Sequence, residues 1–361
     1  MKVTRSRMLL AGVVGLALVA AACSKSSGSG TTSHTLTGAG STFAQPMYQT
    51  WSQSFLAVEP NTKLNYQGIG SGGGIQQFTA KTVDFGATDV PLQDADIAAL
   101  PSKDYVEFPT CLGAVVFAYN VPGLTADLKL DGATIADIFL GKITKWNDAA
   151  IAQQNPGVSL PDLAIQIAHR ADESGTTAVW TGWLSDESAT WKSQVGADKA
   201  VEWPVGTGGN GNDGVAALIS QTPGTAGYLS FDFAVSAKLG TADIKAPDGS
   251  YVAPSIDSIS KAGGGLAFPI TPTANILNSS TAGAYPVAST TYVLIYTQQT
   301  DATTAQELVD FWTWALTKGQ AGTNAINYAP LPTAFAASAL NEVKKITLNG
   351  NPVTPGSAVT G

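Results

Sequence analysis

Large apolar side chains recur every four residues from Phe43 to Phe55, through Met47 and Trp51, which places them along one face of a helix. A turn of small and hydroxyl-bearing residues, 37–42, directly precedes this stretch. The same arrangement, a short turn followed by a run with helical character, returns along the chain. The pattern predicts helices at 43–55, from 75, and at 95–100, 134–141, 178–184, 215–219 and 305–317.

Short apolar or β-branched runs separate these helical stretches and predict buried strands. The clearest run is Thr290 to Thr297, and the apolar stretch 163–168 ends in the pair His169 and Arg170. Further strands are expected at 63–67, 83–89, within 105–120 and at 227–229. Strands that alternate with helices indicate an α/β fold with mainly parallel sheets flanked by helices. About 340 residues follow the leader described below, which suits two lobes better than one core.

Three turns between a predicted strand and a predicted helix combine glycine with hydroxyl side chains. They are 37–42, 68–74 and 171–177, and the loop 206–214 is a fourth of similar composition. At the start of a helix, backbone N–H groups lack partners and the helix dipole is positive, so an anion is favoured there. Arg170 adds a planar guanidinium directly before the third turn. These turns predict an anion site.

Each of these features also has a purely structural interpretation. Ser174 is a common type of helix cap, with Arg170 then paired to Asp172 on the surface. Asp89, at the end of the predicted strand 83–89, could cap the next helix, and Trp180 is expected in the core. The tail beyond Asn349 is expected to be loose.

The first residues have the layout of an export signal. Within 1–22 a basic start precedes an apolar run and three alanines, and Cys23 follows directly. This arrangement resembles the lipobox of bacterial lipoproteins, which implies cleavage before Cys23 and acylation of its sulfur, as with palmitate. An ordinary cleaved signal is the alternative. Residues 23–34 are rich in serine and glycine, which predicts a flexible, lipid-anchored linker at the extracytoplasmic face of the cell membrane.

Charge and composition exclude several classes of function. Removal of the leader's three basic residues lowers the formal net charge from −8 to −11, and no basic run appears, so a nucleic-acid partner is not expected. If Cys23 is acylated, Cys111 is left without a disulfide partner and is expected to be a buried thiol. There are two histidines, His34 in the linker and His169, so we expect no metal cluster.

Taken together, the motifs resemble the phosphate-binding proteins of bacterial high-affinity phosphate ABC transporters, which have the two-lobed type II periplasmic binding protein fold. The resemblance runs from Leu36 to about Leu348. It is carried by the segments 36–43, 66–71, 83–89, 170–176, 208–214 and 289–292. It implies extracytoplasmic binding of inorganic phosphate and delivery to permease subunits with their ATPase. It also implies a monomer that is not an enzyme and needs no cofactor.

The resemblance also assigns residues and lobes. It implies a first lobe of 35–119 and 287–361, a second lobe of 120–286, and a hinge of two crossovers near Tyr119-Asn120 and Pro286-Val287. Asp172 would hold the guanidinium of Arg170. Glu173 stands where some relatives have glycine, which adds an acid beside the site. The residues implied to contact phosphate are Thr42, Phe43, Ser71, Asp89, Arg170, Ser174, Gly175 and Thr176.

Asp89 bears on the choice of anion. A carboxylate in an anion site repels the ligand unless the ligand has a proton to donate, as phosphate has and sulfate lacks at neutral pH. Sulfate or molybdate binding is therefore the less favoured alternative. A hydrolase that uses Ser174 with His169 is also disfavoured, because Gly-x-Ser-x-Gly is absent around Ser174. An adhesion protein is a third possibility.

Overall fold

The structure is a computed structural model that describes residues 33–264 and 276–360. The leader, Cys23 and most of the expected linker lie outside the described residues. No helix in the described part of the chain has the length and apolar character needed to cross a bilayer.

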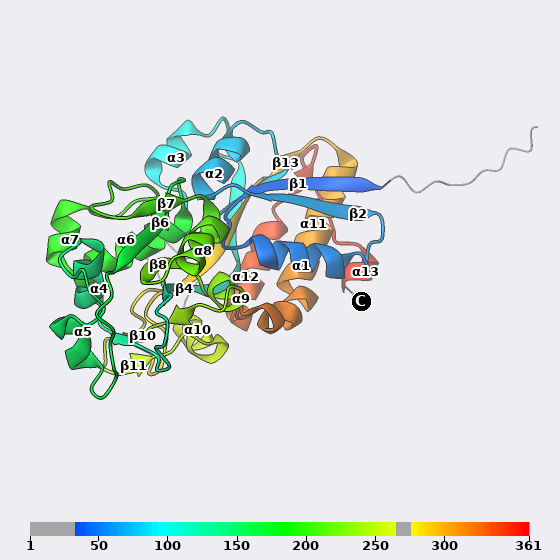
Figure 1. Ribbon diagram of the computed structural model, residues 1–361. Coiled ribbons are helices and arrows are strands. Elements are labelled where there is room, and N and C mark those ends of the chain that lie inside the picture. The colour runs from blue at the N-terminus through cyan, green and yellow to red at the C-terminus, as the bar shows by residue number, and fades with distance from the viewer. Residues whose placement is uncertain (1–32, 265–275, 361) are drawn as a thin grey trace, which may run out of the picture. The chain divides into compact units, whose positions relative to one another are not determined.

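Two groups of strands form one mixed sheet, and helices flank it (Figure 1). In the first group β1, β2 and β3 run parallel, whereas β12 is antiparallel to both β3 and β4. Its order is β2-β1-β3-β12-β4. The strands are β1 (His34–Gly40), β2 (Thr62–Gly68), β3 (Phe85–Thr88), β12 (Ala288–Tyr296) and β4 (Tyr105–Tyr119).

The second group continues from β4 in the order β8-β6-β7, and β9 also pairs with β4. Strands β6, β7 and β8 run parallel to one another. The strands are β6 (Gln166–Arg170), β7 (Thr207–Gly209), β8 (Thr225–Ser230) and β9 (Gly240–Thr241). The α/β class expected from the sequence is therefore present, and the two groups of strands are consistent with two lobes. The pairing in each group is mixed, since β12 and β4 are antiparallel to their neighbours.

Strand β4 belongs to both groups. Its residues up to Ala114 pair with β12, and from Val115 onward they pair with β8. The residue that leads into β12 lies beside this change of partner, because the N–H of Val115 donates to the carbonyl of Val287 at 2.9 Å. The two apolar runs expected within 105–120 are one continuous strand.

Helices cover both groups of strands, and segments distant in sequence pack together. Phe55 at the end of α1 meets Phe311 of α11 with ring centroids 5.3 Å apart, so α1 and α11 pack together although they are far apart in sequence (Figure 1). The helices before β8 are α1 (Gln45–Phe55), α2 (Ser71–Thr79), α3 (Asp94–Ala99), α4 (Gly132–Phe139), α5 (Ala149–Gln154), α6 (Gly175–Glu187), α7 (Ala189–Gln194) and α8 (Gly211–Gln221). Those after β8 are α9 (Phe231–Ser236), α10 (Ile256–Gly263), α11 (Ala302–Leu316), the 3₁₀ helix η1 (Lys318–Ile326), α12 (Thr333–Val343) and α13 (Ser357–Thr360).

Two small sheets complete the described fold. One contains β5 (Lys129–Leu130), β10 (Asp243–Lys245) and β11 (Tyr251–Val252). The other contains β13 (Gln298–Gln299), β14 (Thr347–Leu348) and β15 (Asn351–Pro352).

Two expectations about the chain ends were wrong. The tail beyond Asn349 is ordered, because β15 pairs with β14, Val359 is buried, and the N–H of Gly356 donates to Asp310 at 2.6 Å. His34 is the first residue of β1 and its ring pairs with Glu307, so it is not part of a linker.

Aromatic side chains fill the core on both sides of β4. Trp180 and Trp183 of α6 are fully buried, as their helical spacing predicted. Cys111 is a buried free thiol, and burial raises its pKa above the ordinary value, so it stays protonated.

Candidate functional site

Four helices begin close to one another, each after a strand or turn of the mixed sheet. They are α1, α2, α6 and α8, and the buried residues at or just before their starts include Thr42, Ser71, Ser174 and Asn212. Parallel strands end at the same edge of a sheet, so the loops that follow them meet there. The sequence had indicated three of these helix starts as an anion site, and α8 adds a fourth.

Asp89 follows β3 and lies among hydroxyl groups, with its side chain 4% exposed. Its Oδ1 accepts hydrogen bonds from Ser41 and, at 2.7 Å, from Thr291, while its Oδ2 lies 3.4 Å from the hydroxyl of Thr176. Burial raises the pKa of the Asp89 carboxyl above its ordinary value, and these hydrogen bonds and the charge of Arg170 oppose the shift. Asp89 does not cap α3, which Gln93 caps instead.

Arg170 ends β6 and is 3% exposed. Its guanidinium binds both oxygens of Asp172, with Nε donating to Oδ1 at 2.7 Å, and Nη1 donates to Thr176 at 3.3 Å. Burial alone would raise the pKa of Asp172, but the hydrogen bonds and charge of Arg170 bring it below the ordinary value. The supporting role expected for Asp172 agrees with this geometry, and the pair joins a buried Arg170 to a partly buried Asp172 rather than lying on the surface.

Asn212, at the start of α8, connects segments from both halves of the chain. Its Nδ2 donates to the hydroxyl of Thr42 at 2.9 Å and lies 3.4 Å from that of Thr176. Its backbone N–H also points to Thr42 at 3.3 Å. The hydroxyl groups at the starts of α1 and α6 therefore meet at one amide.

Gly175 sits in a close contact between α6 and the segments around Ser71 and Asp89. A Cβ atom at this position would clash with the hydroxyl of Ser71 and would lie 2.7 Å from the Cβ of Asp89, a distance that real Cβ atoms essentially never show. The N–H of Gly72 donates to the carbonyl of Glu173 at 3.0 Å nearby. Only a residue without a side chain fits this contact.

The structure brings all eight predicted site residues into this one region. Ser71 accepts from the N–H of Asp89 at 3.2 Å, and Ser174 caps α6 by accepting from the N–H of Thr177 at 3.1 Å. The Phe43 ring packs edge-on against Tyr328 in the core, so only its backbone is available to a ligand. Glu173 is exposed and lies over Gly72, so its charge faces solvent.

Three buried residues of the site were not assigned from the sequence: Ser41, Asn212 and Thr291. Ser41 and Asn212 stand in glycine turns that the sequence had marked, next to assigned or cap-like positions, so a signal existed for both. Thr291 lies inside β12, where a β-branched residue indicates only a strand. Its place beside Asp89 follows from the antiparallel pairing of β12 with β3.

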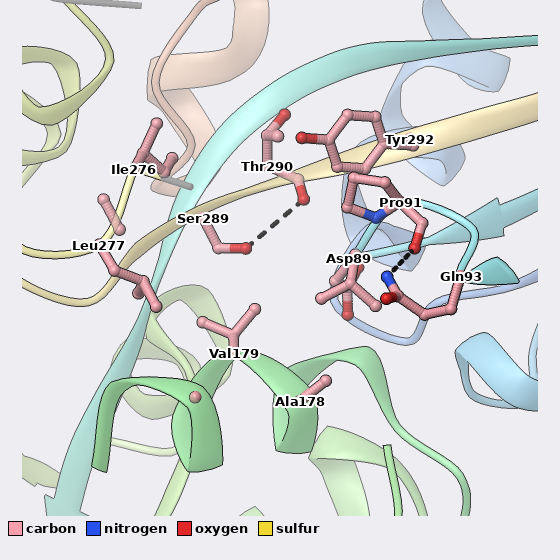
Figure 2. A pocket seen from close by; sticks show the side chains of 13 residues that line it. Asp89, Pro91, Gln93, Ala178, Val179, Ile276, Leu277, Ser289, Thr290 and Tyr292 are labelled. Atoms are coloured by element: carbon pink, nitrogen blue, oxygen red, sulfur yellow. Dashed lines mark hydrogen bonds between the residues drawn. The ribbon is translucent and has the colours of Figure 1, made fainter. Parts of the chain in front are cut away.

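A cavity of about 150 Å³ opens beside Asp89 (Figure 2). Figure 2 shows Ala178 and Val179 of α6 facing Ser289 and Thr290 of β12 across it. The cavity therefore lies next to the polar cluster, between a helix of one group of strands and a strand of the other.

The arrangement suits a small oxyanion. Arg170 supplies a cation and the helix starts supply N–H and hydroxyl donors, whereas Asp89 is an acceptor in the same cluster. Helix starts and a guanidinium favour negative charge. A buried carboxylate favours a ligand that brings a proton.

Comparisons with known proteins agree with this geometry. Residues 25–318 match the family model described as a PBP superfamily domain. A phosphate-binding protein PstS from Pasteurella multocida is 40% identical over 305 residues, covering 84% of this chain and 88% of that protein. The chain belongs to the PstS family of the PBP superfamily. A PstS from Xylella fastidiosa is also 40% identical, covering 82% of this chain and 81% of that protein.

A solved structure has the same fold as this PBP superfamily member. It is a phosphate ABC transporter substrate-binding protein with bound phosphate from Clostridium perfringens. The TM-score is 0.59 at 16% sequence identity, and the match covers 83% of this chain and all of that protein.

Proposed function

We propose that this protein binds inorganic phosphate outside the cytoplasm and delivers it to the permease of an ABC-type phosphate importer. The observation that carries the proposal is that buried donors and one buried acid meet in a single cluster. Asp89 contacts residues at the starts of α1, α2 and α6, and Arg170 and Asn212 join the cluster through Thr176. The names of the relatives from Pasteurella and Xylella support it, as does the phosphate bound by the Clostridium protein.

The eight predicted contact residues are proposed as the phosphate ligands, with Ser41, Asn212 and Thr291 as their polar neighbours. Each hydrogen bond to a charged oxygen contributes roughly 1.5 to 3 kcal/mol net, less the freedom lost on binding. Several such bonds are enough for micromolar affinity. The donors are local, so they outweigh distant acidic groups that salt screens.

Binding without catalysis is part of the proposal. The Ser174 hydroxyl caps α6, and the His169 ring stacks on Trp203 with centroids 4.9 Å apart. His169 Nδ1 lies 2.9 Å from the carbonyl of Arg170, and burial lowers the pKa of the ring. These contacts occupy both groups that a serine hydrolase would use. Incubation with a chromogenic phosphate ester tests the point, because turnover would contradict it.

The proposed hinge lies where the chain passes between the two groups of strands. Because β4 changes partner at Ala114-Val115, we place the first crossover there rather than at Tyr119-Asn120. The second, at Pro286-Val287, adjoins it through the bond from Val115 to Val287. Bending at these adjacent segments would open and close the site. The first lobe expected as 35–119 with 287–361 is therefore proposed to end its first segment at 114, and the second lobe, expected as 120–286, to begin at 115.

We also propose that Cys23 is acylated after removal of residues 1–22, and that a monomer is held at the outer face of the membrane. Metabolic labelling with a palmitate analogue tests the anchor. Replacement of Cys23 by alanine should abolish labelling and release the protein.

Calorimetric titration of the purified protein with phosphate and with sulfate tests the function directly. We expect saturable phosphate binding and little sulfate binding. Equal affinity for the two anions, or no binding of phosphate, would overturn the proposal.

A further inference from the structure

A buried carboxylate lies outside the set of phosphate contacts, next to the site. Asp232, in the first turn of α9, is 5% exposed and accepts a hydrogen bond from the hydroxyl of Ser230. The hydroxyl of Tyr328 is a second neighbour that can hydrogen-bond to this carboxyl. No cation is among the groups that influence it, so burial of this acid is offset by hydrogen bonds alone.

One arm of this cluster reaches the site through Asn212. The N–H of Ser230 donates to Oδ1 of Asn212 at 3.0 Å. This bond fixes the orientation of the amide, so that its Nδ2 faces Thr42 and Thr176. Asp232 holds the side chain of Ser230, the residue whose backbone holds Asn212.

The other arm reaches the site through Tyr328. Its hydroxyl donates to the carbonyl of Phe43, the residue that follows Thr42. The two arms therefore leave Asp232 through different residues, Ser230 and Tyr328, and reach adjacent residues just before α1. Because Asn212 and Thr42 come from different halves of the chain, this ring of hydrogen bonds passes through a contact that closes the site.

The direction of the bonds depends on whether Asp232 carries a proton. Tyr328 has a single hydroxyl proton, and it is directed to Phe43. The tyrosine oxygen can then only accept from Asp232, which requires a protonated carboxyl. An ionised Asp232 is an acceptor only, so it competes with Phe43 for the proton of Tyr328 and adds a negative charge behind the site.

The other groups around Asp232 stay neutral or do not titrate, so the direction of these hydrogen bonds depends on the protonation of Asp232 itself. On β4 the titratable neighbour is Cys111, and after η1 it is Tyr328; burial raises the pKa of both above their ordinary values, so both stay neutral. The β8 and α8 neighbours Ser230 and Asn212 do not titrate, and Asp213 of α8 is exposed. Burial raises the pKa of Asp232 to about 7, although the neighbouring hydroxyls of Ser230 and Tyr328 favour the ionised carboxyl and act in the opposite direction.

We propose that Asp232 is a positioning residue of the phosphate site, which acts through Tyr328 and Ser230 and couples phosphate affinity to its own protonation. The proposal rests on the proposed function. Protonated Asp232 supports the bonded arrangement around Phe43 and Asn212, and ionised Asp232 weakens it. Phosphate affinity therefore falls as Asp232 loses its proton.

The test compares wild type with Asp232→Asn by calorimetric titration with inorganic phosphate. The asparagine amide can donate to Tyr328 and its oxygen can accept from Ser230, so the variant imitates the protonated acid at every pH. Because both proteins bind the same ligand, the ratio of their Kd values cancels the titration of phosphate. We expect wild-type Kd divided by variant Kd to rise roughly two- to tenfold between about pH 6 and about pH 8.

Glu107→Gln is the matched control. Glu107 is another buried acid whose pKa burial raises to about 7, but its hydrogen bond comes from the backbone of Leu92 at 3.0 Å. Its Kd ratio to wild type should stay constant with pH. A ratio that rises equally in both variants would overturn the proposal, because the effect would then belong to buried charge in general.

A second variant keeps the test valid if Asp232→Asn folds poorly. Tyr328→Phe keeps the ring against Phe43 and removes the hydroxyl that links Phe43 to Asp232. It should bind phosphate more weakly than wild type at about pH 6 and show a shallower dependence of Kd on pH. If both variants bind phosphate as tightly as wild type and with the same dependence of Kd on pH, this proposal is overturned but the proposed function is not. Absence of phosphate binding by wild type at every pH would overturn the proposed function as well.

Discussion

We expect Asp89 to decide the choice of anion, because its carboxylate has no ion-pair partner in the described part of the chain and lies among hydrogen-bond donors. Replacement by asparagine removes a repulsion of about 4 kcal/mol, the cost of two charges about 4 Å apart at an effective dielectric near 20. Asp89→Asn should therefore improve sulfate binding by up to roughly a thousandfold, while phosphate binding weakens less. Calorimetry with both anions measures the two changes.

Asp84→Asn is the control for this substitution. Asp84 precedes β3 and accepts from the N–H and hydroxyl of Thr37 at 2.7 and 2.8 Å, away from the cluster around Asp89. Its anion preference should match that of wild type. Continued exclusion of sulfate by Asp89→Asn would contradict the role given to Asp89.

At the level of single residues, the sequence was most informative where a special residue stood in a marked turn. Arg170 and Ser174 could be predicted because a cation and a cap precede a helix. Thr291 could not, because its neighbour Asp89 is 202 positions away in sequence and only strand pairing joins them. The burial of Asp232 was equally hidden, since an aspartate near a helix start is ordinarily a solvated cap.

Among the elements, helix α6 combines a stability role with the proposed binding role. Ser174→Ala removes the cap bond to Thr177 and should lower the free energy of unfolding by about 1 kcal/mol. It should also weaken phosphate binding about tenfold, since one donor to the anion is lost. Urea unfolding and calorimetry measure the two effects.

Ser188→Ala separates the two effects. Ser188 caps α7 by accepting from the N–H of Trp191 at 3.2 Å, so its loss should lower stability by a similar amount. Phosphate affinity should not change. A tenfold loss of affinity in both variants would show that general destabilisation, and not the Ser174 hydroxyl, weakens binding.

A partly buried ion pair joins α3 to the segment that follows α7. Lys199 Nζ lies 2.7 Å from Asp96 of α3, with side chains 14% and 18% exposed, and the Lys199 carbonyl accepts from the N–H of Ser174. Lys199→Met should speed phosphate release and raise Kd about threefold to fivefold, since the pair stabilises the closed arrangement by about 1 kcal/mol. Stopped-flow measurement of dissociation tests this.

The exposed pair of Lys145 and Asp162 provides the control. Its Nζ to Oδ1 distance is also 2.7 Å, but the side chains are 57% and 66% exposed, and both residues precede β6 in sequence. Lys145→Met should leave the release rate unchanged. If added salt speeds release from wild type and Lys199→Met equally, the ion pair does not hold the site closed.

Elements with clear periodicity were predicted well, and weakly patterned ones were not. The apolar stripe of α11 and the β-branched run of β12 correspond to the observed elements within a few residues. The tail beyond Asn349 lacks any apolar run, so its pairing with β14 and the contact of Gly356 with Asp310 had no local signal. Tertiary contacts, not local propensity, order that segment.

For the whole molecule, buried acids make stability depend on pH. Burial raises the pKa of Glu107 from 4.5 to about 7, although the bond from Leu92 opposes the shift. The folded state therefore binds this proton more tightly than the unfolded state, so stability falls as pH rises from about 4.5 to about 7. Wild type should lose roughly 2 to 3 kcal/mol relative to Glu107→Gln across this range.

Urea unfolding of both proteins without phosphate, at about pH 5 and about pH 8, measures this loss. Asp89 and Asp232 contribute in the same direction, because burial raises the pKa of each. They remain in both proteins and cancel in the comparison. An equal slope for wild type and Glu107→Gln would contradict the assignment to Glu107.

The sequence predicted two lobes but not how they are joined. Alternation of strands and helices indicated the class, whereas the exchange of partners within β4 depends on which strands flank it. The residues on both sides of the change, 111–119, form one apolar run, so the change at Ala114-Val115 leaves no mark in the residue pattern.

Gly175 has a consequence for transport as well as for binding. The contact of Gly175 with Ser71 and Asp89 has no room for another carbon atom. Gly175→Ala would therefore keep the two lobes from closing around the ligand. A permease that binds only the closed, phosphate-bound form would not bind such a variant even at saturating phosphate. One added methyl group could thus separate capture of the nutrient from its uptake by the cell.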